Sequence, residues 1–68
     1  MTNLQKMRES RNLTTKELSE KSGVSIKTII SYETGRKDIN HCRPITALKL
    51  ARALNCHVED IAELDRIF

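Results

Sequence analysis

Two cysteines and two histidines have the most versatile chemistry in this chain, and they lie in two adjacent pairs, His41 with Cys42 and Cys56 with His57. Two thiolates and two imidazoles can complete a tetrahedral zinc site. Adjacent residues seldom both reach one metal ion, however, so the spacing favours ordinary buried or loop residues. Serine and aspartate are also present, but no motif orients them with a histidine for catalysis. We therefore expect no metal, no cofactor and no enzymatic activity.

A second chemistry is the binding of a polyanion, because charge is distributed unevenly along the chain. The 68 residues carry a formal charge of +3. Residues 58–68 hold four acidic residues and one arginine, a net charge of −3, so the 57 residues before them carry +6. A basic body with an acidic end favours a polyanionic partner over a neutral one. No apolar run approaches the length that spans a membrane, so we expect no membrane association of that kind.

The elements that would position such residues centre on residues 15–35, TKELSEKSGVSIKTIISYETG. The pattern predicts two short helices, the first opened by a T-x-x-E capping box. They are joined by a turn at Gly23, where a left-handed backbone favours glycine. Ser25 is a good N-cap for the second helix, and Gly35 ends it. The apolar residues that these helices share as a core are Leu18, Val24, Ile29 and Tyr32.

Three further helices are predicted around this pair. A T-x-x-Q capping box near the N-terminus opens the first of them. Pro44 suits the first turn of the second, and residues 36–43 before it form an irregular connection. The apolar positions of this helix are Ile45, Leu48, Ala51 and Leu54. Residues 58–68 form the last helix, with acidic residues in its first turn, where the helix dipole favours them.

Two stretches carry a family resemblance. LQKMRESRNLTTKELSEKSGVSIKTIISYETGRK resembles the first three helices of the phage repressor and Cro family, the XRE-like helix-turn-helix type, and ALKLARALNCHVEDI resembles its last two. The resemblance implies one all-α domain over residues 1–68, a compact five-helix bundle. Its recognition helix, at about residues 25–34, would enter the major groove of DNA. It also implies a partly buried ion pair between Arg8 and Glu33 that ties the first helix to the third.

We expect two sets of DNA contacts, and for the first set the resemblance implies the positions of Ile26, Lys27 and Ser31. The residues expected at base edges are Ser25, Ile26, Lys27, Thr28 and Ser31. The residues expected at phosphates are Thr15, Lys16, Arg36, Lys37 and Arg43. Lys27 can donate to guanine O6 or N7, and Ile26 can pack on a thymine methyl group. Ile26 and Ile30 on the outer side leave two possibilities open, readout through methyl contacts and DNA shape, or a face that binds protein.

We therefore expect sequence-specific binding of double-stranded DNA by a small bacterial or phage transcriptional regulator. Two cysteines without a signal peptide favour reduced thiols and a cytoplasmic location. One module of this size buries little surface, so we expect a homodimer on DNA. Two roles stay open for the apolar residues Leu64, Ile67 and Phe68, which either join the two copies or pack back on the first helix. We expect no small-molecule ligand. The alternative is a protein-interaction module with the same fold, such as an antitoxin or a coactivator-like adaptor.

Overall fold

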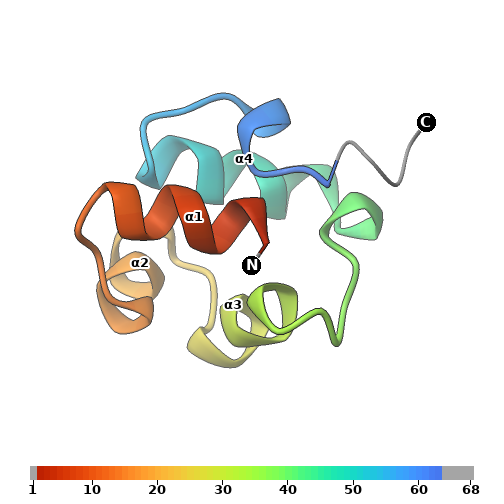
Figure 1. Cartoon of the computed structure of the whole chain (residues 1–68), viewed down its shortest axis with the longest axis horizontal. Coiled ribbons are helices and arrows are strands. Elements are labelled where there is room, and N and C mark those ends of the chain that lie inside the picture. Colours follow the sequence, from red (N-terminus) through yellow and green to blue (C-terminus); the bar gives the residue numbers. More distant parts are fainter. Residues whose placement is uncertain (1, 64–68) are drawn as a thin grey trace.

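The structure, a computed structural model, describes residues 2–63 of the chain. In this part of the chain four α-helices and two single turns of 3₁₀ helix follow one another, and no strand occurs (Figure 1). The elements are, in order, α1 (Asn3–Ser10), α2 (Thr15–Ser22), α3 (Ile26–Glu33), η1 (Ile39–His41), α4 (Pro44–Ala53) and η2 (Val58–Asp60). The prediction of an all-α fold is confirmed, whereas the predicted count of five helices is wrong.

The predicted fifth helix is only the turn η2, because side chains from elsewhere bind the backbone that follows it. Asn40 donates from Nδ2 to the carbonyl of Glu63 (2.9 Å) and accepts from its N–H at Oδ1 (2.9 Å). Asn3 donates from Nδ2 to the carbonyl of Ala62 (2.8 Å). A continuing α-helix would need these same groups for its own i→i−4 bonds. The helix therefore stops, and residues 64–68 lie outside the described part of the chain.

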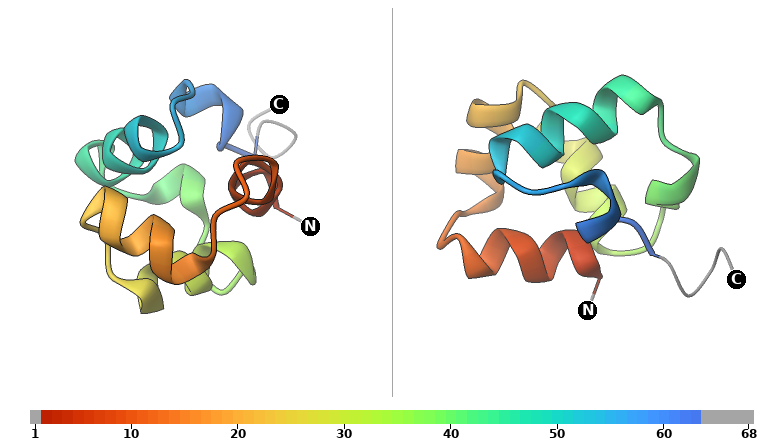
Figure 2. Two further views of the ribbon diagram at one scale, coloured as in Figure 1. Left: turned by 90° about the vertical axis from the view of Figure 1, so that its left-hand side faces the viewer. Right: turned by 90° about the horizontal axis from the view of Figure 1, so that it is seen from above.

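The core lies where the four helices meet. In Figures 1 and 2, α2 packs beside α3 and α4, while α1 crosses one side of the bundle. The largest fully buried side chains are Leu4, Leu18, Ile29, Leu50, Leu54 and Ile61. Helices α1, α2 and α3 have eight residues each, too short to persist alone in water, so this shared core holds them in place.

Helix α4 buries a different side from the predicted one. Ile45 and Leu48 are 56% and 47% exposed. The buried side consists of Ala47, Leu50, Ala51 and Leu54. These four are spaced i, i+3, i+4 and i+7, the pattern that keeps one face of a helix inward. The four predicted positions are each three residues apart. Side chains with that spacing rotate by about 60° around the helix axis at each step, so they cannot all share a face. The prediction was right for Ala51 and Leu54 and wrong for the first two positions.

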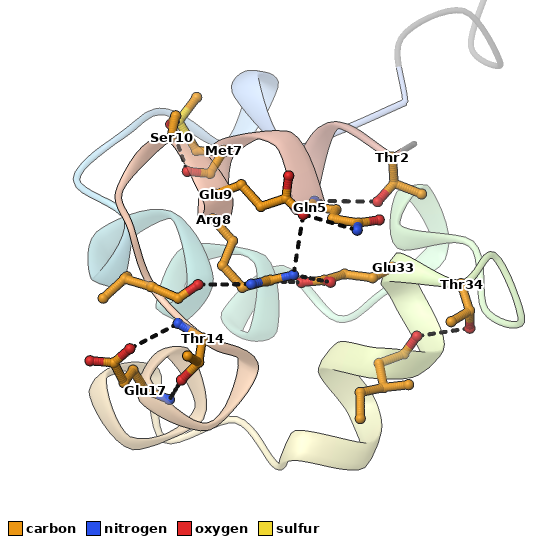
Figure 3. Close-up of polar contacts among 12 residues, drawn as sticks. Thr2, Gln5, Met7, Arg8, Glu9, Ser10, Thr14, Glu17, Glu33 and Thr34 are labelled. Carbon is orange, nitrogen blue, oxygen red and sulfur yellow. Dashed lines mark hydrogen bonds and ion pairs between the residues drawn. The ribbon is translucent and has the colours of Figure 1, made fainter.

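An ion pair between Arg8 and Glu33 connects α1 with α3 (Figure 3). Nε of Arg8 donates to Oε2 of Glu33 at 2.8 Å, and Nη2 donates to Oε1 at 3.0 Å. Nη1 of the same arginine donates to the carbonyl of Leu13 at 2.7 Å, in the connection before α2. The two side chains are only 13% and 7% exposed. The hydrogen bond to Glu33 raises the pKa of Arg8, so the guanidinium keeps its charge throughout the physiological range.

Removing one partner of this pair should be more damaging than removing both. We expect Arg8→Ala and Glu33→Ala each to lower the free energy of unfolding by about 3 kcal/mol, because each leaves a poorly hydrated charge without its partner. The double variant Arg8→Met, Glu33→Leu should lose less than either single variant, because no buried charge is left without a partner. Urea denaturation measures all three, with Arg52→Ala on the exposed side of α4 as control. Single losses below about 1 kcal/mol, the size for a surface pair, would contradict this account.

Candidate nucleic-acid interface

The turn between α2 and α3 is held by side chains at its two ends. Gly23 has the left-handed φ of 77° that the sequence predicts there, and its N–H donates to the carbonyl of Ser19 at 2.9 Å. The Ser19 hydroxyl donates to the carbonyl of Val24 at 2.7 Å, and the Val24 side chain is buried. Gly23 and Val24 are thus both tied to the last turn of α2. The angle at which α3 leaves α2 is therefore set by this turn.

Helix α3 has one buried side and one exposed side. Ser25 is its N-cap and accepts from the N–H of Thr28 at 3.3 Å, so the helix begins where the sequence predicts. Ile29 and Tyr32 are buried against the core. On the opposite side, Ile26 and Ile30 are 38% and 44% exposed. In Figure 1, α3 lies along the lower edge of the molecule, where none of the labelled helices lies below it. The exposed side of α3 is therefore open to a partner.

Two basic residues follow α3 directly and are anchored to its end. Gly35 has φ of 81°, and the chain then folds back so that the N–H of Lys37 donates to the carbonyl of Ser31 at 3.1 Å. Thr34 donates from its hydroxyl to the carbonyl of Ile30 at 2.8 Å (Figure 3). Arg36 and Lys37 are exposed, as is Lys27 on the helix itself. The structure thus brings three cations to α3 and the turn that follows it.

The start of α2 offers backbone N–H groups next to polar side chains. Thr14 and Glu17 form a capping box, with Glu17 N–H donating to Thr14 Oγ1 at 3.1 Å and Thr14 N–H donating to Glu17 Oε1 at 2.9 Å (Figure 3). The hydrogen bonds from Thr14 lower the pKa of Glu17, so this carboxylate is charged near neutral pH. Thr15 and Lys16 are the first two helical residues, whose N–H groups have no acceptor within an α-helix. They are the donors that remain for an anion.

A family model described as helix-turn-helix matches residues 4–61. The chain belongs to this family, in its phage repressor and Cro type. Its members are DNA-binding regulators and are typically not enzymes. No curated protein and no solved structure matches the chain. Within residues 2–63, no helix has both the length and the apolar character needed to span a membrane.

Nine of the ten residues predicted to contact DNA in this helix-turn-helix domain lie on α2, on α3 or in the segments beside them. The tenth residue lies on another element. The base-edge residues lie on α3 or at its N-cap, and four of the phosphate residues lie at the start of α2 or just after α3. Arg43 is the N-cap of α4, beyond the turn η1, and its side chain makes no capping hydrogen bond. Arg43 therefore belongs to α4, which Figure 1 shows above α3, whereas Arg36 and Lys37 follow α3.

The cysteines and histidines contribute to the core and the surface. The thiols of Cys42 and Cys56 are free and partly buried, and burial raises the pKa of both. Among the described residues, no three His, Cys, Asp or Glu side chains are grouped so that they could hold a metal ion. Cys56 and His57 line an open hollow together with Arg11.

Arg11 donates from Nε to the carbonyl of Leu54 at 2.8 Å and so caps the end of α4. No sequence signal pointed to this role.

The left-handed backbone conformation of Gly35 should matter more for the stability of the fold than the absence of a side chain there. A Cβ atom there would meet nothing within 4 Å, so the cost of Gly35→Ala comes only from the positive φ. We expect a loss of about 1 kcal/mol in the free energy of unfolding. Gly35→Asn should lose less, because asparagine tolerates this conformation better. Thermal and urea denaturation measure both, with Lys49→Ala as control. Equal losses for alanine and asparagine would contradict a conformational origin.

Proposed function

We propose that this helix-turn-helix protein binds double-stranded DNA sequence-specifically, as a cytoplasmic transcriptional regulator of bacterial or phage origin, with α3 in the major groove. The observation that supports this most is that α3 has one buried side, with Ile29 and Tyr32, and another side open to solvent. An α-helix with its side chains is about 10–12 Å wide, close to the roughly 12 Å width of the major groove. Lys27, Arg36 and Lys37 supply the positive charge that a duplex attracts.

The proposed contacts divide into those that select sequence and those that hold the duplex. The base-reading residues are Ser25, Ile26, Lys27, Thr28 and Ser31. The residues proposed to bind phosphates are Thr15, Lys16, Arg36, Lys37 and Arg43, of which Arg43 has the weakest geometric support. Phosphate contacts fix the register of a protein on DNA, whereas base contacts determine preference. The anchored turn after α3 suits the first task, because its backbone is already ordered before DNA binds.

A dimer on DNA completes the proposal. A single small module buries little surface, and family dimers bind half-sites about one helical turn, roughly 34 Å, apart. The residues predicted to join two copies, Leu64, Ile67 and Phe68, lie outside the described part of the chain. The preceding residues are held beside the first turn of α1, because the Glu63 carboxylate accepts from the N–H of Asn3 at 2.8 Å.

The rival function is a protein-interaction module, an antitoxin or a coactivator-like adaptor, and it rests on exposed apolar residues. Ile26 and Ile30 on α3 are exposed in the same way as residues that bind protein partners. Backbone NMR spectra recorded with random duplex DNA at low salt separate the two functions. Shifts confined to the regions of Thr15, Lys27 and Arg36 support DNA binding. Unchanged spectra there support the rival.

Lys27 and Arg36 should affect DNA binding in different ways. We expect Lys27→Ala to cost about 1–3 kcal/mol and to relax the preference at one base pair, because a base contact is lost. Arg36→Ala should weaken binding to all sequences and lower the salt slope by about 1. Selection from a random duplex pool followed by salt titrations measures both effects. Lys49→Ala, an exposed lysine on α4, is the matched control. Equal losses on all sequences from both variants would contradict these roles.

The stoichiometry on DNA should be two chains per palindromic site. We expect sedimentation velocity to show a complex of two chains with one duplex that carries both half-sites. A duplex with one half-site should bind one chain, and more weakly. Moving the half-sites apart by half a helical turn should weaken binding to the level of the single half-site, because the two copies would face different sides of the duplex. One chain bound per palindrome would remove the dimer from the proposal.

A further inference from the structure

The exposed side of α3 offers apolar surface and few hydrogen-bond donors. Building on the proposed function, we propose that α3 reads its half-site mainly through the C5-methyl groups of thymine, which Ile26 and Ile30 contact. The two isoleucines are spaced i, i+4 and so lie one above the other on the helix surface. Both are more than a third exposed, although the side chains beside them on the inner face are buried. They form the only large apolar surface that α3 presents to solvent.

The hydroxyl groups of the same helix are already engaged within it. Ser31 donates its hydroxyl proton to the carbonyl of Lys27 at 2.9 Å, and Thr34 donates to the carbonyl of Ile30 at 2.8 Å. The hydroxyls of Ser25 and Thr28 bind each other at 2.8 Å, which leaves one proton between them. A hydroxyl that donates internally can only accept from a base. These residues are therefore poor donors to the O and N7 atoms that line the major groove.

Long donor side chains are also scarce on this helix. The segment from Ser25 to Thr34 contains no Arg, Asn or Gln, the residues that bind guanine or adenine with two hydrogen bonds. Lys27 is the one long cationic side chain in the segment, and an ammonium group binds guanine acceptors as a single point charge. Hydrogen-bonded readout of several base pairs therefore lacks the donors that it needs. Beside the single base contact proposed for Lys27, the two isoleucines are the large exposed side chains of α3 that can distinguish one base pair from another.

The charge around this surface favours DNA over a protein partner. Lys27, Arg36 and Lys37 are exposed on α3 or directly after it. The acidic residue of α3, Glu33, is 7% exposed and bound to Arg8 on the inner side. An apolar pair bordered by cations suits a groove whose walls are phosphates and whose floor carries methyl groups. Among unmodified bases thymine alone presents a methyl group in the major groove, so the expected half-site is rich in A·T pairs at the positions that face Ile26 and Ile30.

Replacing thymine by deoxyuracil tests the proposal, because it removes only the methyl group. A duplex selected from a random pool is resynthesised with one deoxyuracil at a time, and affinities are measured by fluorescence anisotropy. At each contacted position we expect about a fourfold loss, the factor that corresponds to about 0.8 kcal/mol for one buried methyl-sized group. Where a contacted T·A pair is changed to C·G, 5-methylcytosine should bind more tightly than cytosine by a similar factor.

Variants of the two isoleucines connect the effect to α3. Ile26→Ala and Ile30→Ala should each abolish the difference between thymine and deoxyuracil at one position and retain it at the other. Both residues are exposed and alanine favours helices, so the fold should persist, as circular dichroism can verify. Leu48→Ala is the control, since Leu48 is equally exposed but lies on α4. This variant should discriminate between thymine and deoxyuracil as the unmodified protein does.

The possible failures are distinguishable. Tight binding that is indifferent to every deoxyuracil overturns methyl readout and leaves the proposed DNA binding intact. Discrimination that persists in both isoleucine variants also overturns the inference, because the methyl groups would then be read by other residues. If no duplex binds even at low salt, the proposed function fails and methyl readout fails with it. In that case the same isoleucine pair becomes the candidate surface for a protein partner.

Discussion

A bidentate ion pair joins the first and third helices at a place where neither side chain is well hydrated. The third bond of the Arg8 guanidinium reaches the connection before α2, so one side chain sets the positions of α1, α3 and the start of α2. Each of these helices has eight residues and depends on its neighbours for stability. Ile29 and Tyr32 occupy the buried side of α3, so the side that carries Lys27 and Ile30 is left to solvent.

Helix ends in this small domain are satisfied by side chains from other elements. The Glu63 carboxylate accepts from the first turn of α1, where negative charge complements the helix dipole. Arg11 donates to the carbonyls of Leu54 and Asn55 at the C-terminal end of α4. Asn40 binds the chain after η2 through both atoms of its amide. The bonds of Glu63 and Arg11 connect residues near the start of the sequence with residues near its end. The same bonds therefore cap helix ends and hold the packed elements together.

The surface proposed to meet DNA combines two kinds of interaction with different physical character. Arg36 and Lys37 attract phosphates through charge, which weakens as salt increases. Ile26 and Ile30 exclude water from apolar groups, an effect that added salt does not screen. Affinity would then come mainly from the basic residues and selectivity mainly from the two isoleucines, with Lys27 contributing at one base pair. Such a division is compatible with a helix that has few free donors and a small contact area.

The sequence by itself determined the helices around the turn and the open side of α3. Capping boxes, the N-cap Ser25 and the glycines act over three or four residues, so their pattern predicts α2 and α3 closely. Only the tertiary structure decided the end of the last helix, the buried side of α4 and the role of Arg11. The bonds responsible join residues far apart in the chain, such as Asn3 with Ala62 and Arg11 with Leu54. No local pattern contains such partners, because they come together only when the core forms.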